Sequence, residues 1–453
     1  MADLAFLGTA LHTPRRGELE PLNEALIVVG EDGFIKAVHR QGSAAAAVEA
    51  RRFAAMDRLV SLSPGQFLLP GLVDLHIHAP QWPQLGKALD LPLEEWLQKY
   101  TFPLEAKCAD SVYAQTIYES LVGNLLANGT TTALYFASIH LPATQRLADI
   151  CLRRGQRALI GRVAMDHADQ CPPFYRDPSA VHAEAETREF IRYVRALPGN
   201  GAGLILPVIT PRFIPACSDE LLRRLGGLAA ETGCHVQTHC SESDWEHGHV
   251  LGRCGVSDTT ALAGFGLLTR HTVLAHGNFI GDGDVDRIVA AGAGIAHCPL
   301  SNVYFSDAVF PLRRMLDRAV HVGLGSDIAG GASPSILENA RHAVIASRLL
   351  EAGVDPALPR EQRRRPDSRI DATTAFWLAT AGGGVALDLP VGVFEAGYQF
   401  DAMVIDAGGP QRNLRVESGD SPDEILQKII YGAARADIRE VWVSGRRVHA
   451  REP

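Results

Sequence analysis

The sequence predicts an α/β protein, in which a (β/α)8 TIM-type barrel is joined to a small composite β-sandwich domain built from both chain ends. Three observations favour this fold class. Short apolar strands alternate with helical patterns through the central part of the chain. Both ends of the chain are instead rich in short segments in which apolar and polar residues alternate, with turn residues between the segments. The length of 453 residues exceeds one ordinary core and favours one large domain with a smaller one.

Residues 1–66 are predicted to form the N-terminal part of the small β domain. Alternating segments fall at 2–11, 25–29 and 33–39, and Pro-Arg-Arg and Glu-Asp-Gly sequences supply turns between them. An alanine-rich stretch at 44–58 fits either a helix or a loop.

Residues 67–382 carry the strand-then-helix alternation of a catalytic barrel domain. Ser218 before an acidic pair is typical of a helix N-cap, and Asn128-Gly129 of a helix end. Helical patterns fall, for example, at 111–128, 218–232 and 282–291. The eight barrel strands are expected at 67–76, 131–138, 158–165, 204–210, 235–240, 273–277, 293–298 and 321–326.

Residues 383–453 return to a β-rich texture and are predicted to complete the small domain. Strand patterns fall at 391–394, 401–405 and 440–448, and Ser444-Gly445 predicts a hairpin turn within the last of them. Because β-rich segments flank the barrel on both sides in the sequence, the simplest packing joins them into one domain.

The composition is that of an ordinary globular protein and argues against several classes of partner. The net charge is −9 and no dense basic stripe is present, which disfavours nucleic acid. The start lacks the pattern of a signal peptide, and no apolar run approaches transmembrane length, so no membrane partner is expected. Eight cysteines without a Cys-x-x-Cys pair predict a reduced, cytoplasmic protein.

Residues of the kind that bind metals follow the predicted barrel strands. His76 and His78 end the first strand, His239 the fifth, His276 the sixth and Asp327 the eighth. One buried histidine is more often a core residue, and a lone aspartate often caps the next helix. Active sites of such barrels lie where the strands end, however, and five residues at that face together predict a metal site.

The same residues suggest how such a site would work. Three imidazoles, from His76, His78 and His239, and the carboxylate of Asp327 would hold a metal and leave a position for water. Asp327 could also accept a proton from that water, and His276 could hold the water or the developing alkoxide by a hydrogen bond. Glu242 would lie near a bound ring and could carry a proton to it.

A site with one metal is favoured over a site with two. Related two-metal barrels often bridge their ions with a modified lysine at the end of the fourth strand. The lysines are at positions 36, 87, 99, 107 and 428, so the barrel has none at that place. The sequence still allows two metal ions bridged by a group other than a lysine.

Longer segments carry a resemblance to a known family. They lie at 70–81, 96–103, 128–132, 135–137, 210–213, 237–242, 275–277, 296–299 and 323–331. With these segments the chain resembles the amidohydrolase superfamily from about Leu69 to Gly445. Gln81, Arg212-Phe213 and the 96–103 segment make it similar to those members that deaminate guanine. Cys240 and Leu300 depart from the family pattern without removing any proposed ligand.

The resemblance implies a function and a set of roles. It implies one Zn²⁺ per chain at His76, His78, His239 and Asp327, and the hydrolytic deamination of guanine to xanthine and ammonia in purine breakdown or salvage. Water activated by the metal would add to C2 while Glu242 shuttles protons. Relatives are commonly homodimers.

The substrate-binding set implied by the resemblance agrees with the chemistry of guanine; it comprises Gln81, Arg212, Phe213, Glu242 and His276. Arg212 can donate to the O6 carbonyl, Phe213 can stack on the flat ring, and Gln81 offers a donor and an acceptor to the purine edge. Taken singly, Arg212 also fits a surface ion pair, Phe213 a core aromatic and Gln81 a solvated loop residue.

Two alternatives stay open from the sequence. One is another aminohydrolase of this superfamily, acting on a different purine, a pterin or a triazine, and the pocket residues would distinguish it. The other is a barrel that has lost catalysis and acts as a scaffold. Such proteins typically lose metal ligands, whereas every proposed ligand is present here.

Overall fold

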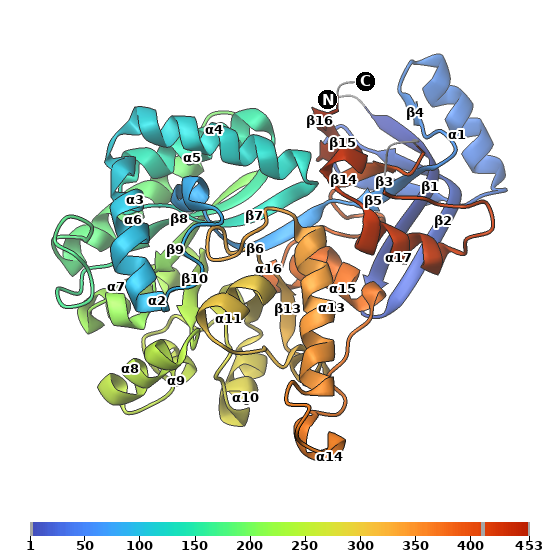
Figure 1. The fold of residues 1–453 in the computed structure, drawn as a ribbon. Coiled ribbons are helices and arrows are strands. Elements are labelled where there is room, and N and C mark those ends of the chain that lie inside the picture. The colour runs from blue at the N-terminus through green and yellow to red at the C-terminus, as the bar shows by residue number, and fades with distance from the viewer. Residues whose placement is uncertain (1–2, 409–412, 452–453) are drawn as a thin grey trace.

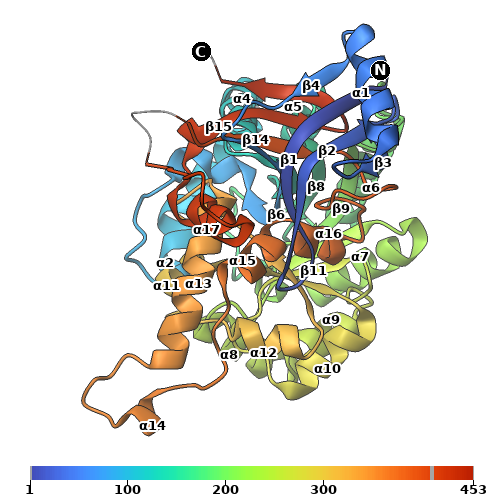
Figure 2. The ribbon, with the colours of Figure 1, turned by 90° about the vertical axis from the view of Figure 1, so that its right-hand side faces the viewer.

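Two eight-stranded sheets organise the chain in the computed structural model, which describes residues 3–408 and 413–451 (Figure 1). One sheet is parallel and forms the barrel, with helices around it. The other is mixed, lies to one side and contains strands from both ends of the chain (Figures 1 and 2). The predicted α/β class and the joining of the two chain ends are both confirmed.

The barrel strands are hydrogen-bonded in chain order, each parallel to the next. Each is buried along most of its length, as expected for strands covered by helices on one side and by the barrel interior on the other. They are β6 (Leu72–His78), β7 (Thr130–Phe136), β8 (Arg157–Ala164), β9 (Ile205–Pro211), β10 (His235–Cys240), β11 (Thr272–His276), β12 (Gly294–His297) and β13 (His321–Leu324).

Helices connect these strands, and one of them begins at the capping residue that the sequence predicts. Ser218 accepts a hydrogen bond from the backbone N–H of Leu221 and so caps α7, as expected. The elements between barrel strands are η1 (Ala79–Gln84), α2 (Leu93–Trp96), η2 (Leu97–Thr101), α3 (Phe102–Ala106), η3 (Lys107–Ala109), α4 (Ser111–Ala127), α5 (Leu141–Arg154), α6 (Ala180–Ala196), η4 (Ile214–Ala216), α7 (Asp219–Thr232), α8 (Asp244–Cys254), α9 (Asp258–Gly264), α10 (Asp282–Ala291), α11 (Pro299–Phe305) and α12 (Leu312–Asp317). Four helices follow the last barrel strand: α13 (Ile336–Ala352), α14 (Arg360–Arg363), α15 (Ala372–Ala379) and α16 (Ala381–Leu387).

The first and last barrel strands are joined by backbone hydrogen bonds at their C-terminal ends. Asp327 N donates to His76 O at 2.8 Å, and His78 N donates to Ile328 O at 2.9 Å. Asp74, which is unusual in a buried strand, accepts from the backbone N–H of Ser326 at 2.9 Å and from its hydroxyl at 2.5 Å. Burial raises the pKa of Asp74 to about 7 despite these bonds. The polar contacts therefore close the barrel beside the histidines.

The mixed sheet runs in the order β16-β15-β14-β5-β1-β2-β3, with β4 beside β1. The short distance between two of its rings shows that the sheet curls on itself. The ring centroids of Phe6 in β1 and Trp442 in β15 are 5.0 Å apart. Three strand spacings of about 4.8 Å would separate them in a flat sheet. Its elements are β1 (Leu4–Arg15), β2 (Glu18–Val29), β3 (Ile35–His39), β4 (Leu59–Ser61), β5 (Gln66–Pro70), β14 (Ala402–Asp406), β15 (Ile438–Val443) and β16 (Arg446–Ala450), with α1 (Ala44–Ala55), α17 (Pro422–Gly432) and η5 (Arg435–Asp437).

The structure differs from two of the strand predictions. The single strand expected at 67–76 is two strands, because β5 pairs with β1 and β14 in the mixed sheet and β6 begins the barrel. Gly71 separates them where the backbone passes Thr131, whose hydroxyl oxygen would lie 2.1 Å from an added Cβ. Residues 391–394 are irregular rather than a strand.

A buried ion pair connects the barrel to the mixed sheet. Arg157 of β8 donates from Nε and Nη2 to the carboxylate of Asp401, at 3.0 and 3.2 Å, and both side chains are nearly inaccessible to solvent. Ser444 also donates its backbone N–H to Asp401 at 2.8 Å. The pair fixes the barrel against the strands that follow it in the chain.

We expect Asp401→Ala to lower the free energy of unfolding by about 3–5 kcal/mol, because it leaves the Arg157 guanidinium buried without a counter-charge. Urea denaturation of the purified protein measures this. Asp169→Ala, at an exposed position, should change stability by no more than about 0.5 kcal/mol. Equal midpoints for the two variants would contradict the assigned importance of the ion pair.

Candidate active site

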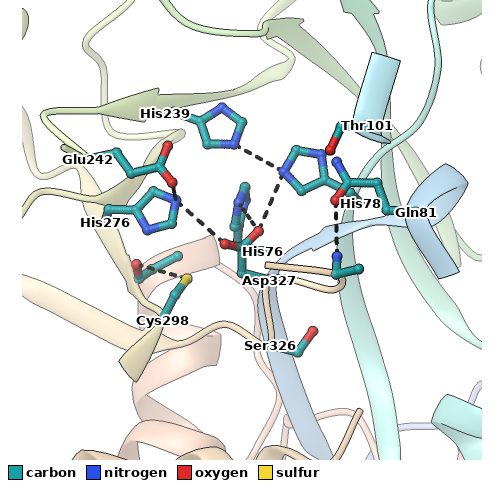
Figure 3. Close-up of polar contacts among 12 residues, drawn as sticks. His76, His78, Gln81, Thr101, His239, Glu242, His276, Cys298, Ser326 and Asp327 are labelled. Carbon is teal, nitrogen blue, oxygen red and sulfur yellow. Dashed lines mark hydrogen bonds and ion pairs between the residues drawn. The ribbon is translucent and has the colours of Figure 1, made fainter. Parts of the chain in front are cut away.

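The nine residues singled out from the sequence converge at the C-terminal end of the barrel. His76 and His78 end β6, His239 lies in β10 and His276 ends β11. Figure 3 shows their rings around the carboxylate of Asp327, which follows β13. Gln81 lies in η1, Arg212 and Phe213 directly follow β9, and Glu242 follows β10.

The histidine nitrogens and carboxylate oxygens approach one another closely. His76 Nε2 lies 3.0 Å from Asp327 Oδ1, and His78 Nε2 lies 3.5 Å from the same oxygen. His78 Nε2 also lies 3.0 Å from His239 Nε2. Three overlapping groups could therefore hold a metal ion: His76 with His78 and His239; His76 with His276 and Asp327; and His239 with Glu242 and His276.

Two site residues have a backbone conformation that side-chain-bearing residues rarely adopt. His276 has φ of +71° and Asp327 has φ of +47°, both in the left-handed region. Such conformations cost about 1–3 kcal/mol each and cluster at active sites and ligand-binding positions. Here both side chains turn toward the same centre (Figure 3).

Burial sets the charges in this cluster. It lowers the pKa of His76 and lowers those of His78 and His239 well below their ordinary value, so these imidazoles are neutral near pH 7. Burial alone would raise the pKa of Asp327, but the nearby rings of His76 and His276 lower it to about 2. The cluster thus combines neutral nitrogen donors with one carboxylate.

These donors fit a divalent metal such as zinc. Neutral imidazoles and a carboxylate are the ligands of catalytic zinc sites. The Nε2 atoms of His78 and His239 face each other, and buried His76 Nε2 has no hydrogen-bond partner although a carboxylate oxygen is near. On the other side of the His239 ring, Nδ1 contacts the carbonyl oxygen of Arg212 at 2.6 Å, which orients that ring.

Glu242 and His276 form a second pair beside the cluster. Glu242 Oε1 lies 3.6 Å from His276 Nε2, and Nδ1 of the same ring contacts Asn302 Oδ1 at 3.0 Å. Burial raises the pKa of Glu242 to about 7, although the neighbouring His276 opposes the rise. A carboxyl with this pKa can both take up and release a proton near neutral pH.

A hollow with about 370 Å³ of space free of atoms opens on this cluster. Its floor includes His78, His239, Glu242 and Asp327, and Arg212 and Gln81 contribute polar groups. The remaining lining is mostly apolar and comprises Leu93, Trp96, Leu97, Phe213, Ser301, Phe305 and Gly330. A flat, polar-edged molecule the size of a nucleobase suits such a pocket.

The arginine and the glutamine of the pocket share a partner that the sequence analysis missed. Glu105 accepts from Arg212 Nη1 at 2.7 Å, from Arg212 Nη2 at 3.1 Å and from Gln81 Nε2 at 2.7 Å. Arg212 is therefore not a surface residue and Gln81 is not solvated, since both are buried. The one signal for Glu105 was its place two residues after the 96–103 segment.

Other residues around the site also came only with the structure. Asn302 contacts His276, and Phe305 lies against Trp96 with ring centroids 4.8 Å apart. Trp96 lines the pocket as part of the segment after β6, whereas Trp82 donates to Ser120 and does not line it.

Comparison with known proteins shows which family and which solved structures the chain is similar to. A model of the amidohydrolase family matches residues 67–448. The guanine deaminases of Dictyostelium discoideum and Homo sapiens are each 34% identical to the chain, in alignments that cover 98% of it and 97% and 96% of those proteins. The crystal structure of guanine deaminase from C. acetobutylicum, with guanine bound in the active site, has a TM-score of 0.88 at 28% identity and covers 99% of the chain and 100% of that protein.

Proposed function

Because this chain belongs to the amidohydrolase family, we propose that it is a guanine deaminase, which converts guanine and water to xanthine and ammonia. The observation that carries the proposal is the full-length likeness to guanine deaminases at 34% identity. The pocket beside the buried histidines and Asp327 supports it, because a nucleobase there would lie next to the groups that a hydrolase needs.

We propose that one zinc ion per chain is held by His76, His78, His239 and Asp327. When bound, it would make a water molecule acidic enough to react near neutral pH. The neutral state of the three imidazoles suits this role, because a protonated ring has no lone pair for a metal.

The pocket residues would hold guanine by its oxygen and by its flat face. The Arg212 guanidinium can donate to O6, and the Phe213 ring offers an apolar surface to the purine. Gln81 adds polar contacts at the purine edge. Adenine carries an amino group where guanine carries O6, so it would leave buried N–H donors without an acceptor.

The protons would move through Glu242, His276 and Asp327. Addition of water across the C2–N3 bond requires one proton at N3, and loss of ammonia requires another at the amino group of C2. Glu242, with a pKa of about 7, can deliver both in turn, after taking up protons that the water releases. His276 would hold the oxygen that adds to C2, and Asp327 would accept one of the two water protons and pass it to Glu242.

An assay of guanine conversion tests this function. Purified protein should lower the absorbance of guanine, raise that of xanthine and release one ammonia per guanine. Metal analysis should find about one zinc per chain. A panel with other purines, pterins and triazines completes the test, since good turnover of another ring without turnover of guanine would overturn the proposal.

We expect Arg212→Lys to lower kcat/KM for guanine by about 10–100-fold, because lysine cannot reproduce the paired N–H donors of a guanidinium. The lysine keeps a positive charge beside Glu105, so the fold and the zinc content should be retained. Arg223→Lys, at an exposed position of α7, is the matched control and should leave kcat/KM unchanged. A loss of zinc in Arg212→Lys would contradict a role confined to the substrate.

The expected cytoplasmic location is a proposal from the sequence, and the expected homodimer is a proposal from the resemblance to relatives that are commonly dimers. Within the part of the chain that the structure describes, no helix is long and apolar enough to cross a membrane. All eight cysteines are free thiols and seven of them are buried, which suits a reducing compartment. Size-exclusion chromatography with light scattering measures the oligomeric state.

A further inference from the structure

Glu105 lies behind the substrate pocket as a fully buried carboxylate. It belongs to α3, in the segment that follows β6, and it has no solvent-exposed surface. Its oxygens accept from the guanidinium of Arg212 and from the amide of Gln81. A charge this deeply buried is costly unless it is paired, and here Arg212 supplies the opposite charge while the Tyr175 hydroxyl adds a further hydrogen bond.

The charge on Glu105 fixes which way the amide of Gln81 points. A carboxylate only accepts hydrogen bonds, so Gln81 must turn its Nε2 toward Glu105. Gln81 Oε1 then faces the other way and accepts the backbone N–H of Ala329 at 3.0 Å. Nε2 carries a second N–H, and Gln81 lines the pocket, where this donor can meet a ligand.

The same carboxylate fixes the plane of the Arg212 guanidinium. It takes one N–H from each of the two terminal nitrogens, and the guanidinium also lies over the ring of Phe102, 4.9 Å from its centroid. A guanidinium has five N–H groups, so three are not taken by Glu105. Arg212 lines the pocket, where these groups can meet a ligand.

We propose that Glu105 is a positioning residue that sets substrate selectivity: by holding Arg212 and Gln81 together, it makes this wall of the pocket a wall of N–H donors. Such a wall accepts a purine with a carbonyl at C6 and disfavours one with an amino group there. The proposal rests on the proposed deamination of guanine. Glu105 acts through its two partners and does not itself line the pocket.

The test compares binding of two purines in Glu105→Gln. The readout is the ratio of the inhibition constant of 2,6-diaminopurine, which has an amino group in place of O6, to KM for guanine. We expect the substitution to lower this ratio at least tenfold, mainly through a higher KM, with a smaller change in kcat. Zinc content and the thermal unfolding midpoint are measured on the same samples, because a purely structural defect would change these and leave the ratio alone.

Two further variants complete the design. Glu95→Gln makes the same change at an exposed residue ten positions earlier and should keep the wild-type ratio. Glu105→Asp keeps the charge on a shorter side chain and should give an intermediate ratio; it decides the question by the same measurement if Glu105→Gln is not recovered folded. An unchanged ratio in a folded, zinc-loaded Glu105 variant would overturn the proposal, whereas failure of the wild-type protein to convert guanine would instead overturn the proposed function.

Discussion

Replacing His239 with alanine should remove the bound metal and the deaminase activity together. His239 faces His78 across 3.0 Å and is oriented through Nδ1 by the carbonyl oxygen of Arg212. Without its ring, the proposed set of ligands is reduced to the two histidines of β6 and Asp327. Since a catalytic metal contributes several kcal/mol to transition-state stabilisation, ammonia release should fall by about 10³-fold or more.

Metal analysis and the ammonia assay on the same preparation check this result. His235→Ala is a suitable control, because His235 lies on the same strand at the opposite end and contacts the Leu387 carbonyl oxygen rather than the site. It should keep both zinc and activity. A His239→Ala protein that keeps a full complement of zinc would remove His239 from the set of ligands.

Replacing Glu242 with glutamine should leave the metal in place and lower kcat by about 10²–10⁴-fold, the usual contribution of a general acid–base residue. Glutamine has almost the same shape and can still contact His276, but it cannot exchange a proton. KM for guanine should change much less than kcat. Steady-state kinetics with zinc-loaded protein separate the two parameters.

The matched control for Glu242→Gln is Asp244→Asn, an acid-to-amide change at an exposed position two residues away. It removes a carboxylate close to the site and should have little effect on kcat. If both variants lose turnover equally, the local charge matters and the proton-carrying role of Glu242 is wrong. Near-normal turnover in Glu242→Gln would also contradict the proton-carrying role of Glu242.

The sequence predicted the barrel and most of the polar floor of the site because both depend on local periodicity. A parallel strand places its last residues at one edge of the barrel, so a histidine or aspartate at a strand end is directed to that edge without knowledge of the tertiary structure. This reasoning needs each strand end only to within a few residues. It therefore identified His76, His78, His239, His276 and Asp327 before any distance was known.

The contacts behind the pocket could not be predicted in this way. Glu105 lies outside any strand, and its partner Arg212 follows it by 107 residues. No periodic pattern distinguishes a buried carboxylate from an exposed one, although a buried arginine at a strand end does require a counter-charge near it. The division of 67–76 into two strands was missed for a related reason, since both halves are apolar and only their pairing partners differ.

The place of β5 in the mixed sheet has a consequence for how the chain folds during synthesis. This strand lies between β1, which is made before it, and β14, which begins at Ala402. One edge of β5 therefore stays unpaired while the whole barrel is translated. Arg157 likewise lacks its counter-charge until Asp401 has been made. Open strand edges favour wrong pairing and aggregation. A protein truncated before residue 401 should therefore aggregate even though its barrel sequence is complete.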